Sequence, residues 1–308
     1  MTSTTQKLMD KGLTSGAPPF LRSNVHYETI MGSHAYGVAD TAVKEKLPDY
    51  DVYGFAIPPK EMLFKHLTGW IPGFGPEPTG FDLWQQHHII DMQSGSHGKE
   101  WDFQIFSIVR FFELCRENNP NMIDALFTPE ECIIHCTQIG RMVRDKRKLF
   151  LSKLCWKKFR GYAHAQLRKM NDKEPIGGRK EIIAKYGYDV KFAYHIVRLF
   201  DEAEQILLEG DLDLRRGREV MKAIRRGDWK VEDLRAWVME KDKALEAVYS
   251  RSMLPEKPPI APLQQLLLDC LETHYGSLQD CVSITGWAES LLREIDSLIA
   301  SQRNRLYQ

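Results

Sequence analysis

The segment Gly32-Ser33-His34-Ala35-Tyr36-Gly37, followed after a short linker by Asp49-Tyr50-Asp51-Val52-Tyr53-Gly54, decides how this chain is interpreted. Because side chains alternate along a β-strand, the carboxylates of Asp49 and Asp51 point from the same face of one strand. The Gly32-Ser33 turn precedes a short predicted helix, whose first backbone N–H groups suit a phosphate. Metal-binding carboxylates beside a phosphate-binding turn predict metal-dependent phosphoryl or nucleotidyl transfer.

Strands are expected around this segment, over Val25–Met31, Asp49–Ile57, Phe81–Ile90 and Glu100–Phe106. The last has the clearest alternation, with Trp101 on its apolar face and Asp102 on its polar face. If these strands are neighbours, Asp102 joins Asp49 and Asp51 in a space that suits Mg²⁺. An Asp-x-Asp pair or a Gly-Ser turn alone is common on solvated surfaces, but their combination in this order favours a catalytic site.

Helical patterns dominate the rest of the sequence. A short helix is expected from about His34 to before Pro48, and Ser107 is a good N-cap for a helix over Ile108–Arg116. Beyond about residue 150 the apolar residues recur at helical spacing, and Gly210 is expected to end a long helix. Because strands precede helices, the predicted fold class is α+β, a mixed sheet with helices followed by an all-helical domain.

The predicted domain boundaries follow from these patterns. Residues 1–20 are expected to be a flexible tail, residues 21–150 the mixed αβ domain, and residues 151–253 the helical domain. Residues 254–308 are expected to be a linker and a C-terminal helical extension, because Leu254–Pro262 holds four prolines. Apolar stripes beyond Pro262 most often pack on their own domain, and less often form a dimer interface.

Composition narrows the class of protein. The 308 residues carry a formal net charge of zero, so any nucleic-acid-binding surface must be local. No apolar run is long enough for a membrane helix and no signal-peptide pattern is present, so a cytoplasmic protein is expected. The six cysteines lack disulfide spacing. Cys132-Ile133-Ile134-His135-Cys136 has the form of half a zinc site, but no second pair follows at a usual spacing.

The order Gly-Ser, Tyr-Gly and Asp-x-Asp-x-x-Gly resembles the signature of the DNA polymerase β-like nucleotidyltransferase superfamily. A narrower resemblance is to a predicted nucleotidyltransferase family of bacteria and phages, with members associated with RNA-repair operons. Its blocks cover about residues 25–255 and continue in Asp102–Ser107, Asn119-Pro120-Asn121 with Leu126-Phe127, Gly161–Leu167 and Gly187–Leu199. The resemblance implies that residues 21–150 form a minimal polymerase-β-like catalytic domain.

This resemblance also implies roles for particular residues. Asp49, Asp51 and Asp102 would be the catalytic carboxylates and would bind two Mg²⁺ or Mn²⁺ ions, while Gly32 and Ser33 would bind the nucleotide. Glu100 is a rival for the third position, because it shares a strand face with Asp102. Pro48 departs from the serine that precedes the first aspartate in many members. Histidines His87, His88 and His97 are interpreted as loop or core residues rather than ligands.

A second candidate region is the helix that begins near Asp189. Lys191, His195, Arg198 and Glu202 form one continuous stripe along it. One interpretation is a solvated face with an internal Arg–Glu pair. The other interpretation is a cationic wall in which Lys191, His195 and Arg198 hold nucleotide or acceptor phosphates. The resemblance gives this interpretation the same weight as the first.

The sequence and the resemblance together predict a magnesium-dependent nucleotidyltransferase. It would transfer a nucleoside monophosphate from an NTP to an acceptor hydroxyl, such as a tRNA-like 3′ end, and release pyrophosphate. A protein or small-molecule acceptor and a non-catalytic nucleotide-binding module stay open as alternatives. The base of the NTP, the use of a template and the oligomeric state, including a dimer through the C-terminal helices, are not determined by these residues.

Overall fold

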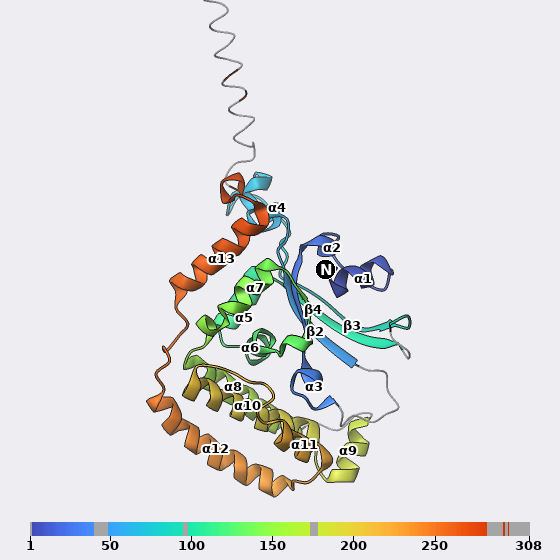
Figure 1. Cartoon of the computed structure of the whole chain (residues 1–308), viewed down its shortest axis with the longest axis vertical. Coiled ribbons are helices and arrows are strands. Elements are labelled where there is room, and N and C mark those ends of the chain that lie inside the picture. The colour runs from blue at the N-terminus through green and yellow to red at the C-terminus, as the bar shows by residue number, and fades with distance from the viewer. Residues whose placement is uncertain are drawn as a thin grey trace, which may run out of the picture.

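A mixed five-stranded sheet carries the first half of the chain (Figure 1). Its strands are β1 (Val25–Ile30), β2 (Asp49–Ala56), β3 (Leu83–Asp91), β4 (Lys99–Ser107) and β5 (Ile133–Cys136), in the spatial order β3-β4-β2-β1-β5. Strands β2 and β4 are parallel, whereas the other neighbouring pairs are antiparallel. The computed structural model describes residues 2–39, 49–94, 98–172 and 178–281, with positions 292 and 295.

Helices surround the sheet and form the second half of the chain, which confirms the predicted α+β class. The helices up to residue 150 are α1 (Thr4–Asp10), α2 (Leu21–Asn24), α3 (Gly32–Ala35), α4 (Lys60–Leu63), α5 (Ile108–Arg116), α6 (Pro120–Phe127) and α7 (Gln138–Asp145). Those beyond it are α8 (Leu154–Asp172), α9 (Gly178–Tyr186), α10 (Val190–Glu209), α11 (Arg218–Arg226), α12 (Val231–Arg251) and α13 (Ile260–Tyr275). Single 3₁₀ turns occupy Lys65–Thr68, Glu130–Cys132, Arg147–Phe150 and Leu278–Cys281.

Capping residues explain where the helices begin and end. The Ser107 side chain accepts a hydrogen bond from the Arg110 N–H, as predicted for the N-cap of α5. Gly210 ends α10 in the left-handed conformation, which also agrees with the sequence prediction. The expected helix after Gly32 is a single turn that ends at Ala35, and residues 40–48 lie outside the described part of the chain.

Two sequence predictions differ from the structure, one about the last strand and one about the start of the chain. Strand β5 was not expected after residue 110, because its four residues follow a 3₁₀ turn and show no clear alternation. It pairs with β1, and the His135 imidazole contacts the Val25 carbonyl at 3.1 Å. The described His, Cys, Asp and Glu side chains form no potential metal group at Cys132–Cys136.

The second correction concerns the predicted flexible tail over residues 1–20, of which residues 2–20 are described and pack against the sheet. Helix α1 lies against the sheet, and Leu8 is 1% exposed within a small core shared with Val52 and Phe103. The buried carboxylate of Glu28 accepts hydrogen bonds from the first N–H groups of α1, at 2.7 and 2.9 Å. Burial of apolar side chains and capping of the helix therefore order this polar segment.

One apolar core runs from the sheet into the helical half of the chain. It includes Tyr27 and Phe55 of the sheet, Phe111 of α5 and Ile196 of α10. Helices α8 and α10 lie side by side, and α11 and α12 pack against α10 (Figure 1). This continuous packing fixes α10 relative to the strands that carry the aspartates.

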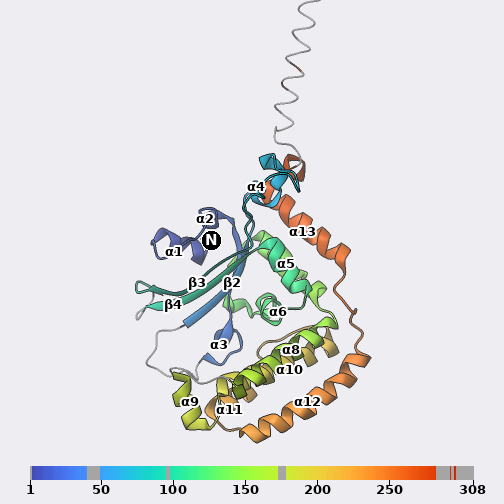
Figure 2. The same ribbon diagram turned by 180° about the vertical axis from the view of Figure 1, so that it is seen from behind.

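Helices α12 and α13 form an outer strap that returns from the helical half to the sheet (Figure 2). The proline-rich linker ends at Pro259, earlier than expected, because Pro262 fits the first turn of α13. The Tyr275 hydroxyl donates a hydrogen bond to the Pro58 carbonyl at 2.6 Å. Most residues of the second predicted C-terminal stripe lie outside the described part, and Ile295 is exposed. Among the described helices, none has the length and apolar character needed to cross a membrane.

Candidate metal and nucleotide site

Three aspartates meet where the parallel strands β2 and β4 lie side by side. Asp51 pairs in register with Asp102, and Asp49 pairs with Glu100. Side-chain oxygens of Asp49, Asp51 and Asp102 all lie within 4.8 Å of one another. The Glu100 carboxylate instead contacts the His88 imidazole at 2.6 Å. The geometry therefore brings Asp102, rather than Glu100, to the aspartate pair of β2.

The carboxylates of this cluster repel one another. Burial, followed by the charges of Asp49 and Asp102, raises the pKa of Asp51 above its usual value. The positive charges of Lys191 and His87 act in the opposite direction. Carboxylate oxygens are the preferred ligands of Mg²⁺ and Mn²⁺, and a divalent ion would offset the repulsion. The three carboxylates therefore fit the divalent metal that the sequence predicts.

Gly32 lies directly against this cluster. Its φ of +65° falls in the left-handed region, and a Cβ added there would lie 2.5 Å from Oδ2 of Asp51. The next N–H before it, from Met31, donates to the Asp51 carbonyl at 2.7 Å. Only glycine lets the chain turn so close to the carboxylate. The predicted Gly32-Ser33 turn and the predicted metal ligands are therefore adjacent.

A β-bulge places two histidines over the third aspartate. The β3–β4 register shifts at His87 and His88, and His88 has a φ of +56°. The His88 N–H donates to Oδ1 of Asp102 at 2.7 Å, and the His87 imidazole lies 3.2 Å from Oδ2. Sequence analysis did not assign these histidines to the site, although two adjacent histidines interrupt the strand alternation there. His97 lies outside the described residues.

The start of α10 faces the aspartates. Asp189 caps the helix by accepting a hydrogen bond from the Lys191 N–H at 2.9 Å. The exposed Lys191 ammonium acts on the Asp51 carboxylate, as a residue near the metal site would. One turn later His195 contacts the ring of Tyr36 edge to face, with the centroids 6.5 Å apart. Lys191 is therefore within electrostatic range of Asp51, whereas His195 contacts the Gly32–Gly37 turn through Tyr36.

Arg198 is buried, whereas the predicted stripe was expected to face either solvent or phosphate groups. Its guanidinium contacts the Asp124 carboxylate, lies 3.1 Å from Oε1 of Glu202 and stacks over the Tyr36 ring at 4.4 Å. The Tyr36 hydroxyl also donates to Asp124 at 2.9 Å. The pair with Glu202 is therefore internal, as one interpretation held, but it is not solvated. In this arrangement Arg198 holds Tyr36, and with it the Gly32–Gly37 turn.

Arg215 holds the same turn from another side. This residue precedes α11, and its guanidinium donates to the carbonyls of Ala35 and His34, each at 3.3 Å. It also forms an ion pair with Glu131. In the sequence Arg215 is one member of a basic cluster, and nothing in the spacing separates it from its neighbours. The helical half of the chain therefore contacts the predicted phosphate-binding turn through two arginines, Arg198 and Arg215.

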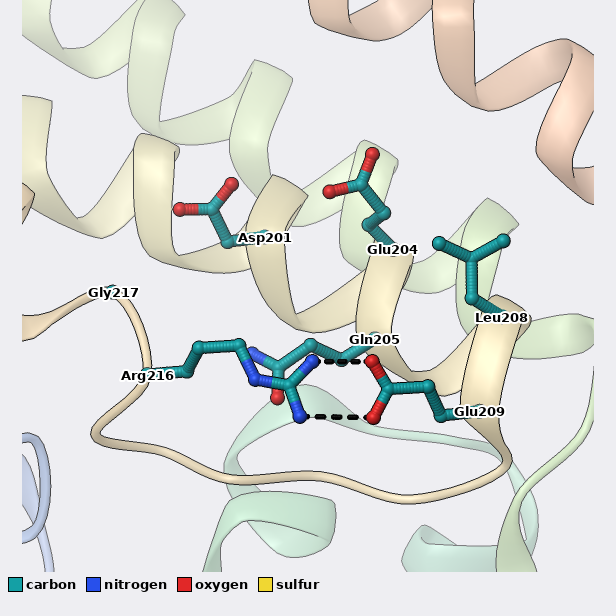
Figure 3. A pocket seen from close by; sticks show the side chains of 7 residues that line it. All are labelled: Asp201, Glu204, Gln205, Leu208, Glu209, Arg216 and Gly217. Carbon is teal, nitrogen blue, oxygen red and sulfur yellow. Dashed lines mark hydrogen bonds and ion pairs between the residues drawn. The ribbon is translucent and has the colours of Figure 1, made fainter.

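A separate cavity of about 300 Å³ lies on the C-terminal half of α10 (Figure 3). Asp201, Gln205 and Arg216 line it, and Arg216 closes one side by a double contact with Glu209. None of the residues predicted for the metal and nucleotide site lines this cavity. It is therefore distinct from the aspartate cluster.

Comparison with protein families identifies the family of this chain. The model of the RNA repair pathway DNA polymerase beta family (RlaP) matches residues 15–260. This range includes all five strands and ends at the first residue of α13, so it contains the aspartate cluster and the start of α10. No curated protein and no solved structure matches the chain.

Proposed function

Because this chain belongs to the RNA repair pathway DNA polymerase beta family, we propose that it is a metal-dependent nucleotidyltransferase that acts on RNA 3′ ends. It would transfer a nucleoside monophosphate from an NTP to the terminal hydroxyl and release pyrophosphate. The observation that carries this proposal is the pairing of Asp51 with Asp102 across two parallel strands, with Asp49 beside them. Gly32 next to the same carboxylates supports it.

The three aspartates and the Gly32-Ser33 turn would have different roles in this reaction. Asp49, Asp51 and Asp102 would hold two Mg²⁺ or Mn²⁺ ions, which neutralise phosphate charge and favour in-line displacement. The acceptor oxygen bonds to the α-phosphorus as the bond to pyrophosphate breaks. Asp102 accepts the acceptor proton, which then passes to water. The backbone of Gly32 and Ser33 would orient the phosphates, and fixed alignment would supply much of the acceleration.

The stripe on α10 completes the proposed site. Lys191 is exposed at the first turn of the helix and would contact a phosphate oxygen, with His195 one turn behind it. Arg198 was expected to bind the nucleotide directly, and its burial suggests that it acts by positioning Tyr36. In this way α10 would connect the nucleotide to the metal ligands.

The test is incorporation of label into RNA. The purified protein is incubated with Mg²⁺ or Mn²⁺, total RNA and each α-labelled NTP in turn, and the products are resolved on a denaturing gel. We expect label in RNA with the wild type and none with the Asp49→Asn, Asp51→Asn double variant. Glu113→Gln is the matched control, because that carboxylate lies on α5 and, among the described residues, pairs with Arg110.

The possible outcomes test the identity of the acceptor and the type of reaction independently. Label found in protein or in a small molecule, and lost in the double variant, would retain nucleotidyl transfer but contradict an RNA acceptor. Equal incorporation by the wild type and the double variant would refute the assignment of the aspartates. Tight NTP binding without pyrophosphate release would indicate a non-catalytic module.

A further inference from the structure

Arg225 on α11 differs from its neighbour Arg226 in having no acidic partner among the described residues. Met221 and Ile224 anchor α11 in the core, and Arg225 lies half-buried on the flank of the helix. Its guanidinium lies over the ring of Tyr194, 5.4 Å from the centroid. Within the described part of the chain it forms no ion pair and no hydrogen bond, whereas its neighbour Arg226 is paired with Asp228 at 2.8 Å.

Tyr194 is the second unusual group at this position. Its ring is 3% exposed, yet its hydroxyl forms no hydrogen bond with any described residue. Burial raises the pKa of this hydroxyl, while the charges of Arg225 and Arg198 act to lower it and that of Asp51 to raise it, so the hydroxyl lies within electrostatic range of the aspartate cluster. A phenol hydroxyl that no described residue satisfies can donate a hydrogen bond to water or to a ligand.

The chemistry of these two groups selects an anion. A guanidinium presents five N–H donors in a rigid fork that matches phosphate oxygens, and a phenol supplies one further donor. A half-buried guanidinium that pairs with no described carboxylate is stabilised when an anion binds to it. Because Tyr194 is nearly buried, the site admits a small phosphate group more readily than a nucleic-acid backbone.

The position of α11 relates this pair to the predicted nucleotide site. Arg215, just before α11, is hydrogen-bonded to the carbonyls of His34 and Ala35. The helix is therefore fixed relative to the Gly32–Gly37 turn, and α10 packs beside it with Tyr194 on its first turns. A nucleotide whose α-phosphate lies at the aspartates could extend its remaining phosphates toward Arg225.

We infer that Arg225 and Tyr194 form a subsite for the β- and γ-phosphates of the nucleotide. This inference rests on the proposed function for the position of the α-phosphate. It assigns two phosphate-binding residues that neither the resemblance nor the sequence spacing identified. It also predicts that α11 makes the site bind nucleoside triphosphates more tightly than monophosphates.

The test measures nucleotide binding without an acceptor. Calorimetric titrations with each NTP and each NMP, in the presence of Mg²⁺, compare the wild type with Arg225→Ala, Tyr194→Phe and the control Arg226→Ala. We expect Arg225→Ala to weaken NTP binding by about ten- to a hundredfold and Tyr194→Phe by about tenfold, with NMP affinity nearly unchanged. Arg226→Ala should bind both as the wild type does, and thermal melting verifies that each variant folds.

Several results would overturn the subsite. These are unchanged NTP affinity in Arg225→Ala, equal losses for NTP and NMP, or no NTP binding by the wild type. Titration with an RNA oligonucleotide distinguishes the other source of phosphate: a loss confined to RNA would assign Arg225 to the acceptor and refute the inference. Arg225-dependent NTP binding in a protein that transfers nothing would refute the proposed function while supporting the subsite.

Discussion

Lowering the pH should weaken the contact between α13 and the sheet, because a buried histidine of β1 is hydrogen-bonded to this helix. Nδ1 of His26 on β1 lies 2.9 Å from the Thr137 hydroxyl, and Nε2 lies 3.0 Å from Nδ1 of His274 on α13. Burial, with His274 and His135 as neighbours, lowers the pKa of His26 from 6.5 to about 3. Protonation of His26 would place a charge among these groups.

The size of the effect follows from linkage between protonation and folding. Since the folded chain has the lower pKa, the stabilisation is present above pH 6.5 and is lost as the pH falls toward 3. Between about pH 8 and about pH 5, these two pKa values correspond to a loss of about 2 kcal/mol in the free energy of unfolding. Burial also lowers the pKa of His274, which adds to the loss in the same direction.

The assay is urea unfolding of wild type and His26→Gln across this pH range, with hydrogen exchange of the α13 amides as a local probe. His164→Gln is the control, because that histidine lies on α8 and is partly exposed. We expect the wild type to lose about 2 kcal/mol more than His26→Gln between about pH 8 and about pH 5. Parallel stability curves for the wild type and His26→Gln would refute this explanation.

Three further predictions concern the site and its supports. Gly32→Ala should cost about 1–2 kcal/mol of stability and weaken Mg²⁺ binding, because the new Cβ meets the Asp51 carboxylate; wild-type metal titrations and melting would contradict it. Asp124→Asn should lower the free energy of unfolding by about 3 kcal/mol, because Arg198 loses a buried partner; a loss below about 1 kcal/mol in urea would show that Glu202 suffices. Truncation after Ser252 should lower the melting temperature without changing the oligomeric state, since α13 packs on its own chain; light scattering that shows a dimer becoming a monomer would support the dimer alternative.

The sequence was most informative where alternation and spacing are strong. The strand with Trp101 and Asp102 formed as predicted, since an apolar and a polar face specify a half-buried strand. The Gly32 turn and the Asp-x-Asp pair were each recognisable as short local motifs, and the antiparallel pairing of β1 with β2 brings them together. Parallel pairing of β2 with β4 could only be assumed, because no local signal specifies which strands are neighbours.

The features that sequence analysis missed depend on long-range contacts. Glu28 orders the start of the chain by capping α1 from a distant strand, which no local pattern reveals. Arg198 and Glu202 have the spacing of a solvated pair, and only packing against Asp124 and Tyr36 buries them. Likewise, the partners of Arg215 are carbonyls of a turn far away in the sequence.

The in-register pairing of Asp51 with Asp102 has a consequence for how the chain reaches its native state. A slip of one residue between β2 and β4 would place Trp101 or Phe103 opposite Asp51 and turn Asp102 to the other face. Such a slip would also move the apolar side chains of β4 away from the core, so burial already favours the aligned sheet. If the aspartates bind a divalent ion as proposed, the ion would stabilise the aligned sheet further, because a slipped sheet no longer holds the three carboxylates together. The proposed metal would then contribute to the alignment of two strands as well as to the reaction.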